Sequence, residues 1–257
     1  MSTLTTLSRS EFTLLVRNRL LLFNAFVLPL VFPVLLLVIG WRSDTGLTDA
    51  GVASALEIFA LFLLVFLVFY NLLSAYTTRR DELVLKRLRT GEATDNQILL
   101  GPAVPSFVLT AILTVILVAV VVVLGGGLPV NPLLLVAALG GGAAMFAALA
   151  LITSTFTRNA EAAQITSFPV ILVAMAGSSV LRGVLPDSVS SVVELTPMAA
   201  VSDLINLGWI GRVDPDSTPL AFAETFSPAL QPLLVVAAWT VGSIVVARTH
   251  FRWEPRA

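Results

Sequence analysis

Six long apolar runs decide what this chain can fold into. They cover residues 20–41, 52–76, 104–124, 133–156, 160–181 and 229–247. Each run is between 19 and 25 residues long. At about 1.5 Å per residue, a helix of this length crosses a bilayer core of about 30 Å. We therefore predict an all-α integral membrane protein with six transmembrane helices, in which residues 1–257 form a single transmembrane domain.

The composition agrees with a membrane protein. Hydrophobic residues make up 57% of the chain and charged residues only 12%, which differs from the balance of a soluble domain. The first apolar run begins at Leu20 and no small-residue cleavage pattern follows it. We expect this run to remain a membrane span rather than to act as a signal peptide.

Nine charged residues lie between the second and third runs, in the 29 residues from Thr77 to Pro105. Charges at this density cannot lie in hydrocarbon, so we predict that the segment is in water. Lys and Arg residues near spans collect on the cytoplasmic side. With this segment and both termini inside, twelve Lys and Arg residues are cytoplasmic and three are outside. We expect both termini in the cytoplasm and the chain in the inner or plasma membrane.

The charged segment also carries the signals of a short helix. Thr78 can cap its start, and Gly91 can take the left-handed conformation that ends a helix. Thr94 and Gln97 have capping-box spacing ahead of the next helix. On charge alone, a solvated loop that only fixes the topology is the favoured interpretation.

Two further segments are expected at the membrane surface. Residues 2–19 place four leucines on one helical arc, which predicts an N-terminal interfacial helix. Glu11 lies on the same arc, and a frayed polar tail is the alternative. The connection from Arg182 to Pro228 begins with two short apolar pieces that Pro197 separates. Pieces too short to span predict outer interfacial or re-entrant helices between spans five and six.

Few polar side chains lie within the runs. Glu57 is about 7 Å below the outer end of the second run at about 1.5 Å per residue. A carboxyl group there is costly unless it faces protein, water or a partner, so it could line a pathway or make a structural bond. Asn24, Asn71 and Gln164 lie toward cytoplasmic ends, where interhelical hydrogen bonding is the usual role. These four are the possible pathway-lining residues.

Small residues in the fourth run predict close helix packing. Gly140, Ala144, Ala147 and Ala148 share one helical face. Small residues at this spacing let a second helix approach closely. We expect another helix to pack against this face.

The sequence lacks the residues of several enzyme classes. Its only lysine, Lys86, follows Leu85, so the glycine-lysine pair of a phosphate-binding P-loop is absent. It has no cysteine, and its single histidine, His250, lies near the carboxyl end, which excludes thiol chemistry and an HExxH zinc site. We expect no enzyme activity, no cofactor and no metal in this chain, and no nucleic-acid partner. What remains is movement of a compound across the membrane.

Several features together resemble the permease subunit of type-2 ATP-binding-cassette (ABC) exporters, of the drug-resistance type. They are a segment ending in Arg17-Asn18-Arg19, a first span with Pro29 and Pro33, a charged helix after span two, and the stretch from Pro186 through Thr196-Pro197 to Asp203. The resemblance covers nearly the whole chain. Where the family has Gly-Thr before the charged helix and Thr-Pro after it, this chain has Leu83-Val84 and Gly91-Glu92.

The resemblance implies that other chains share the work. A separate ATPase subunit would bind ATP and Mg²⁺, and a second permease subunit, identical or paralogous, would complete the pathway through the lipid bilayer. The charged helix, approximately Arg80 to Arg89, would be a coupling helix that docks into the ATPase. Its coupling residues would be Arg79, Arg80, Asp81, Glu82, Lys86, Arg87 and Arg89.

The expected function is export of a hydrophobic or amphipathic compound, such as a drug or a lipid-like molecule. The alternative is a secondary transporter that is driven by an ion gradient and uses Glu57 as its coupling carboxyl. The two hypotheses differ in a testable requirement, because only the exporter needs an ATPase chain.

Overall fold

The computed structural model describes residues 12–13, 17, 19–91, 93–213, 217–251 and 253–254. Over these residues all regular structure is helical, which confirms the all-α prediction. The expected interfacial helix at residues 2–19 lies almost entirely outside the described residues.

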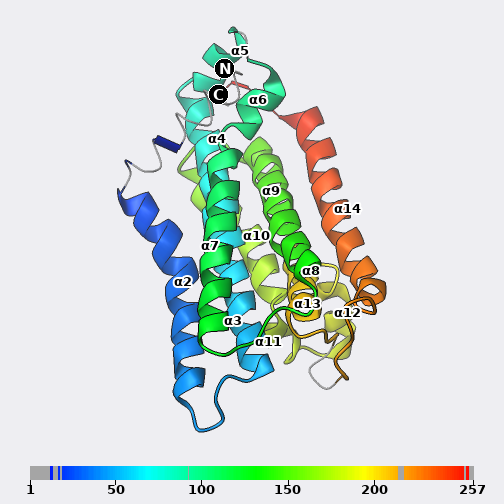
Figure 1. The fold of residues 1–257 in the computed structure, drawn as a ribbon. Helices are drawn as coiled ribbons and strands as arrows, with labels where there is room; N and C mark the ends of the chain where they lie inside the picture. The colour runs from blue at the N-terminus through cyan, green and yellow to red at the C-terminus, as the bar shows by residue number, and fades with distance from the viewer. Residues whose placement is uncertain are drawn as a thin grey trace.

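The helices pack side by side as an elongated bundle (Figure 1). In chain order they are α2 (Arg19–Arg42), α3 (Asp49–Phe62), η1 (Leu63–Tyr70), α4 (Asn71–Asp81), α5 (Val84–Arg89), α6 (Asp95–Leu100), α7 (Ala103–Val123), α8 (Pro132–Val136), η2 (Ala137–Gly141), α9 (Gly142–Phe156), α10 (Ala162–Ala176), α11 (Ser179–Arg182), α12 (Asp187–Val193), α13 (Pro197–Trp209) and α14 (Phe226–His250). The two η segments are π-helical.

Four helical segments of the described chain are long and apolar enough to cross a membrane. They are Asp49–Asp81, Ala103–Val123, Pro132–Phe156 and Phe226–His250. These segments match the second, third, fourth and sixth predicted spans. α2 and α10 supply shorter apolar segments, Phe26–Arg42 and Ala162–Ala176. The six-span layout stays a prediction.

The fifth run does not form one helix over residues 160–181. α10 ends at Ala176, and the chain turns at Gly177 before α11 begins. A Cβ atom at Gly177 would lie 2.7 Å from the backbone nitrogen of Ala199 and closer still to Thr196 Oγ1. Only glycine allows such an approach. The helix stops here because the turn packs against the start of α13.

The second span is the centre of the bundle. α3, η1 and α4 continue without a break from Asp49 to Asp81, and 72% of an 18-residue apolar stretch within them is buried inside the protein. α2, α7, α9, α10 and α13 pack around it. Thr48 caps its start, since its hydroxyl accepts a hydrogen bond from the N–H of Gly51 at 3.1 Å. Its middle, η1, has the wider π-helical winding that is often found at functional sites.

α13 lies inside the bundle rather than on its surface. Met198, Val201, Leu204 and Ile205 are completely buried, and α3, α8, α9, α10 and α14 contact the helix. Pro197 occupies the first turn, where a missing backbone N–H costs nothing. The apolar pattern that predicts a short outer helix therefore belongs to a helix that is enclosed by other helices.

The small face predicted in the fourth run is only partly used for packing. Gly140 and Ala144 are exposed, whereas Ala148 is buried. The close contact is made by Gly142, where a Cβ atom would lie 2.9 Å from Leu64 Cδ1. The π-helical turns of η2 rotate the residues that follow them relative to their positions in a regular α-helix. Residues on the two sides of η2 therefore do not share the face that α-helical spacing predicts.

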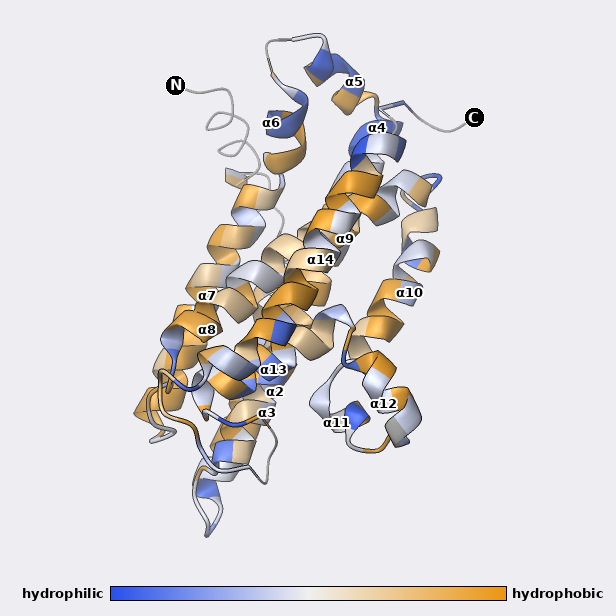
Figure 2. Ribbon diagram, turned by 90° about the vertical axis from the view of Figure 1, so that its right-hand side faces the viewer, coloured by the Kyte–Doolittle hydropathy of each residue, from blue (hydrophilic) through white to orange (hydrophobic). Residues whose placement is uncertain are grey.

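The surface of the bundle separates apolar sides from polar ends. Figure 2 shows hydrophilic residues gathered around α5, α6 and the end of α4, while the long helices are mostly hydrophobic. α2, α7, α10 and α14 expose large apolar side chains such as Phe23, Val115, Ile165 and Val241. Such a surface suits lipid or another membrane subunit.

The two ends of the bundle carry different elements. α14 ends near α5 and α6, whereas α11, α12 and α13 lie toward the opposite end (Figure 1). We call the first the charged end and the second the α13 end.

Candidate functional site

The predicted coupling helix at the charged end is two helices joined by a turn. Thr78, its expected cap, lies inside α4, and α5 begins only at Val84. Between the two helices Leu83 has a φ of 60°, a left-handed conformation that stops α4 and redirects the chain. Gly91 has no positive φ, so the predicted glycine stop is wrong.

Arg80 is buried at the end of α4, with 1% of its surface exposed. Its guanidinium donates hydrogen bonds to the carbonyl oxygens of Ser154 at 2.8 Å, Thr157 at 2.6 Å and Arg158 at 3.3 Å. These oxygens lie at and just beyond the end of α9, where a helix has unsatisfied carbonyls and partial negative charge. Arg80 therefore makes charge-assisted bonds that hold α4 to the end of α9.

Asp81 adds a second link beside Arg80. Its Oδ2 atom accepts a hydrogen bond from the backbone N–H of Ala160 at 2.9 Å. Ala160 lies in the turn between α9 and α10. Two adjacent residues of α4 thus bind backbone carbonyls at the end of α9 and a backbone N–H in the turn that follows it. We call Arg80, Asp81 and the turn at residues 157–160 the α4 clamp.

α5 is attached more weakly than the end of α4. Leu85 is its buried residue, while Lys86 forms an exposed ion pair with Glu254 at 2.8 Å. The hydrogen bond from Lys86 and its positive charge lower the pKa of Glu254. Exposed pairs of this kind contribute little to stability. Arg87 and Glu82 are exposed as well, and Arg87 Nη2 donates to the Glu82 carbonyl at 2.8 Å.

The other predicted coupling residues lie on either side of this corner. Arg89, at the end of α5, forms an ion pair with Asp95 at 3.2 Å, and its guanidinium carbon is 4.9 Å from the centre of the Trp253 ring. Arg79 is half-buried on α4. The structure therefore divides the predicted coupling residues into Arg80 and Asp81, which bind within the protein, and an exposed group on and around α5.

The polar residues predicted within the spans do not lie together. Asn71, on α4, donates a hydrogen bond to Ser106 Oγ of α7 at 3.3 Å, which is the expected interhelical bond. Gln164 is exposed on α10. The side chain of Asn24 lies outside the described residues. A role for these positions in lining a pathway stays a prediction.

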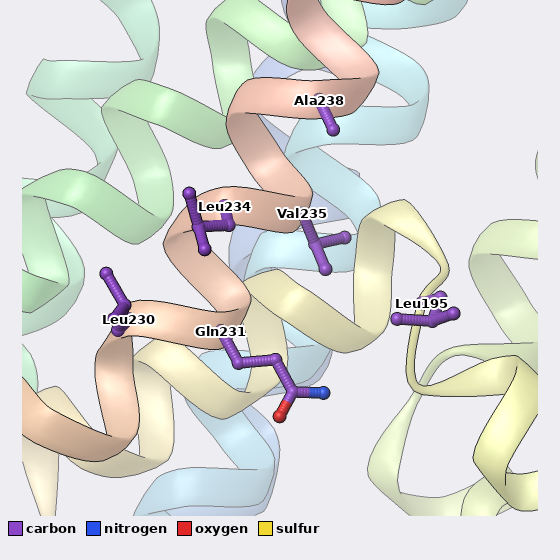
Figure 3. A pocket seen from close by; sticks show the side chains of 6 residues that line it. All are labelled: Leu195, Leu230, Gln231, Leu234, Val235 and Ala238. Carbon is purple, nitrogen blue, oxygen red and sulfur yellow. The ribbon is translucent and has the colours of Figure 1, made fainter.

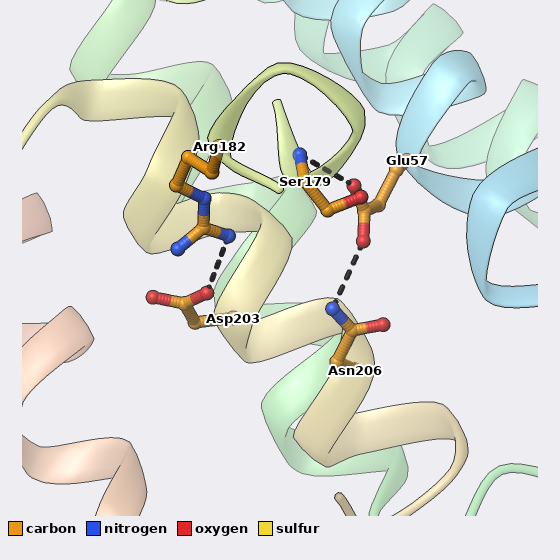
Figure 4. A network of polar contacts seen from close by, with 5 residues as sticks. All are labelled: Glu57, Ser179, Arg182, Asp203 and Asn206. Atoms are coloured by element: carbon orange, nitrogen blue, oxygen red, sulfur yellow. Dashed lines mark hydrogen bonds and ion pairs between the residues drawn. The ribbon is translucent and has the colours of Figure 1, made fainter. Parts of the chain in front are cut away.

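Glu57 belongs to a polar network at the α13 end (Figure 4). It is 5% exposed, and its Oε1 atom accepts a hydrogen bond from Asn206 Nδ2 at 2.9 Å. Its Oε2 atom accepts from the backbone N–H of Ser179 at 3.3 Å. Glu57 on α3 is thus hydrogen-bonded to α13 and to the first residue of α11, which follows the turn that ends α10. Among the residues that the structure describes, none forms an ion pair with Glu57.

An ion pair lies beside this carboxyl group. Arg182 Nη2 on α11 is 2.6 Å from Asp203 Oδ1 on α13 (Figure 4). Burial raises the pKa of Asp203, and the nearby positive charge of Arg182 opposes this rise. The Nε atom of Arg182 is buried and lacks a hydrogen-bond partner within the described chain. Sequence reasoning did not single out this pair or Asn206. The signal was the i, i+3 spacing of Asp203 and Asn206 on one face of α13.

These groups line a cavity of about 820 Å³ that we call the polar pocket. Its walls come from α3, α11, α12, α13, Arg212, Val213 and the start of α14. The charged residues that line it are Asp49, Glu57, Arg182, Glu194, Asp203 and Arg212. No group of three or more Asp, Glu, His or Cys residues in the described chain could hold a metal ion. The pocket is of the size that binds organic molecules.

A second hollow lies on the surface of α14. This apolar groove has a volume of about 420 Å³ and is lined by Leu195, Leu230, Gln231, Leu234, Val235 and Ala238 (Figure 3). Trp239 Nε1 donates to the carbonyl oxygen of Leu195 at 2.8 Å, which joins α14 to the turn before α13. Gln231 also lines the polar pocket. The two hollows therefore share this lining residue.

Comparison with known proteins gives the family. A family model described as ABC-2 type transporter matches residues 2–205, a range that includes the α4 clamp, α5 and most of α13. The chain belongs to the ABC-2 type transporter family, the family of ABC transporter permeases. A search of curated proteins found no match. Family membership implies partnership with an ABC ATPase subunit, and with the four apolar helices it indicates a multi-pass membrane protein.

Proposed function

We propose that this ABC-2 permease is the membrane subunit of an exporter that moves a hydrophobic or amphipathic compound, drug-like or lipid-like, out of the cell. ATP and Mg²⁺ would bind to a separate ATPase chain. The observation that carries the proposal is the α4 clamp next to the exposed α5. In this arrangement the exposed surface of α5, which another protein can contact, is linked to the ends of several helices.

The docking surface in this proposal is α5 and the turn before it. Glu82, Lys86, Arg87 and Arg89 present charges of both signs there. α5 is fixed by one buried leucine and by exposed ion pairs, which cost little to exchange for contacts with a partner. A partner of complementary charge can therefore bind α5 without disturbing the helix bundle.

The α4 clamp would transmit the movement of α5. Because Arg80 and Asp81 bind the turn between α9 and α10, a displacement of α5 pulls on the ends of α4, α9 and α10 together. A clamp of charge-assisted bonds to backbone atoms has little freedom to absorb this displacement. The ATPase would thus act on three helices through a six-residue helix.

The remaining parts of the proposal concern assembly and orientation. The charged end would face the cytoplasm, with both termini on that side, in the inner or plasma membrane. A second permease subunit, identical or paralogous, would pack against the exposed apolar faces of the bundle. The second span offers little surface for this contact because it is largely enclosed by the other helices.

The ion-driven alternative depends on Glu57, and its surroundings favour it less. From Ile58 to Phe69 the second span has only apolar side chains. A proton or ion relay across the membrane needs polar groups along the way. Glu57 and its hydrogen-bond partners are confined to the α13 end, which supports the ATP-driven mechanism.

A charge reversal on α5 tests the proposal. The full chain is purified from membranes that contain its ATPase, and the amount of ATPase that copurifies and its ATP hydrolysis are measured. Arg87→Glu should lower copurification by about tenfold, because one reversed contact costs about 1.4 kcal/mol or more. Arg248→Glu, an exposed reversal at the end of α14, is the matched control and should change nothing. Equal recovery with both variants would exclude α5 as the docking site.

A further inference from the structure

The polar pocket has an excess of negative charge. Among the residues that the structure describes, four carboxyl groups and two guanidinium groups line it, which leaves an excess of two carboxylates. Arg182 is already paired with Asp203. Glu57 is buried and accepts hydrogen bonds only from uncharged donors among the described residues. A carboxylate held in this way attracts a cation more strongly than an exposed one, because water screens it less.

The geometry excludes a bound metal ion as the natural occupant. The carboxyl groups come from α3, α13 and Glu194, the residue after α12, and no three of them in the described part of the chain converge as metal ligands. A volume of about 820 Å³ also exceeds the needs of an ion by far. Pockets of this size bind organic molecules of drug size.

The apolar part of the lining indicates that the occupant also has an apolar part. Ala53, Leu207 and Ile210 contribute apolar wall to the polar pocket, and the apolar groove on α14 shares the lining residue Gln231 with it. The combination fits a molecule with a positive charge at one end and an apolar body at the other.

We propose that the polar pocket and the apolar groove form a binding site for an organic cation with an apolar body. The charged part lies near Glu57 and Glu194, and part of the apolar body reaches the groove beside Leu234. This inference names a substrate class for the proposed exporter and rests on that function only for the direction of movement. The site is formed within one chain and needs neither ATP nor the second subunit.

The absence of cysteine makes the site easy to probe. Ser190→Cys places a thiol in the polar pocket, because Ser190 lines it. Ser191→Cys places one on the neighbouring exposed position of the same helix, outside the pocket. Both full-length variants are prepared in open membrane fragments, in which both faces of the membrane are accessible, and are labelled with a membrane-impermeant maleimide. Tetraphenylphosphonium and tetraphenylborate serve as probes, since they match in size and apolarity and differ in charge.

We expect tetraphenylphosphonium to slow labelling of Ser190→Cys and to leave Ser191→Cys unaffected, whereas tetraphenylborate protects neither. Glu57→Gln in the Ser190→Cys background should raise the half-protecting concentration by about tenfold, as the loss of one charge contact predicts. An unchanged labelling rate without probe shows that this variant folds. Glu194→Gln, at an exposed position, provides the same test with a smaller shift if Glu57→Gln is not recovered.

Three results would overturn the inference. They are equal protection by the two probes, absence of protection by the cation, and protection that neither carboxyl substitution weakens. The labelling requires no ATPase, so its failure is distinct from a failure of the proposed export function. Loss of ATPase copurification would likewise leave the labelling result standing.

Discussion

The charged end and the α13 end both bury a charged side chain, but they surround it differently. Arg80 is enclosed by backbone carbonyls at the end of α9, and it lines neither the polar pocket nor the apolar groove. Glu57 is held by an amide side chain and a backbone N–H, and it lines a cavity of about 820 Å³. The comparison teaches that burial of a charge does not by itself identify a binding site. Free volume next to the charge separates a group that fixes helices from one that can bind a ligand.

The largest expected effect comes from removing the buried cation. Arg80→Met keeps the apolar volume and leaves the carbonyls of α9 without their charged donor. We expect a loss of about 3 kcal/mol in stability, because such groups are costly to bury unpaired. Thermal unfolding of the purified full chain measures it, with Arg87→Met at an exposed position as the control. If both variants unfold at the same temperature, the α4 clamp has no structural role.

The next effect tests the turn that brings Ser179 to Glu57. Gly177→Ala introduces a Cβ atom 2.7 Å from the nitrogen of Ala199, and overpacking of this kind costs about 2 kcal/mol. The matched control is Gly140→Ala, where a Cβ atom would have no neighbour within 4 Å. The same thermal unfolding experiment applies. A stable Gly177→Ala variant would mean that the turn moves easily and that the polar network is loosely built.

A smaller effect is expected from Glu57 itself. Glu57→Leu leaves the Asn206 amide and the Ser179 N–H without an acceptor, which costs about 1 to 2 kcal/mol where water cannot replace it. Because the polar pocket can admit water, we expect the loss to be smaller than for Arg80→Met. Unfolding by heat compares the two variants directly. A greater loss for Glu57→Leu would reverse the assignment of structural and binding roles to the two ends.

The smallest effect is expected on the surface of α5. Lys86→Ala removes the exposed pair with Glu254 and should not change thermal stability measurably, because such pairs are well solvated. The same variant should weaken ATPase binding if α5 is the docking surface. A clear drop in stability would show instead that α5 and the carboxyl-terminal segment support the bundle.

Sequence predicted the parts of the fold that depend on local pattern. The third apolar run, 104–124, matches α7 at Ala103–Val123 because its composition is uniform and nothing interrupts it. Thr94 and Gln97 form the predicted capping box at the start of α6. Both signals lie within a few consecutive residues, so no knowledge of the tertiary structure is needed.

Contacts between distant segments could not be predicted in this way. Arg80 looks solvated in a charged segment, and its burial depends on carbonyls more than 70 residues later in the chain, the nearest at Ser154. Gly177 lies within an apolar run, and its close contact with the start of α13 explains why α10 is short. The pair of Arg182 and Asp203 likewise forms only when α11 packs against α13.

The π-helical winding of η1 has a consequence for movement along the second span. A π segment holds an extra residue compared with an α-helix of the same number of turns. If this segment rewound to α-helical form, each extra residue removed from it would rotate α3 relative to α4 by about 100° and shift α3 along the helix axis by about 1.5 Å. Arg80 holds α4 against the end of α9, so rewinding η1 would rotate α3 and change the orientation of Glu57. A displacement at the charged end would then become a rotation of α3 at the α13 end.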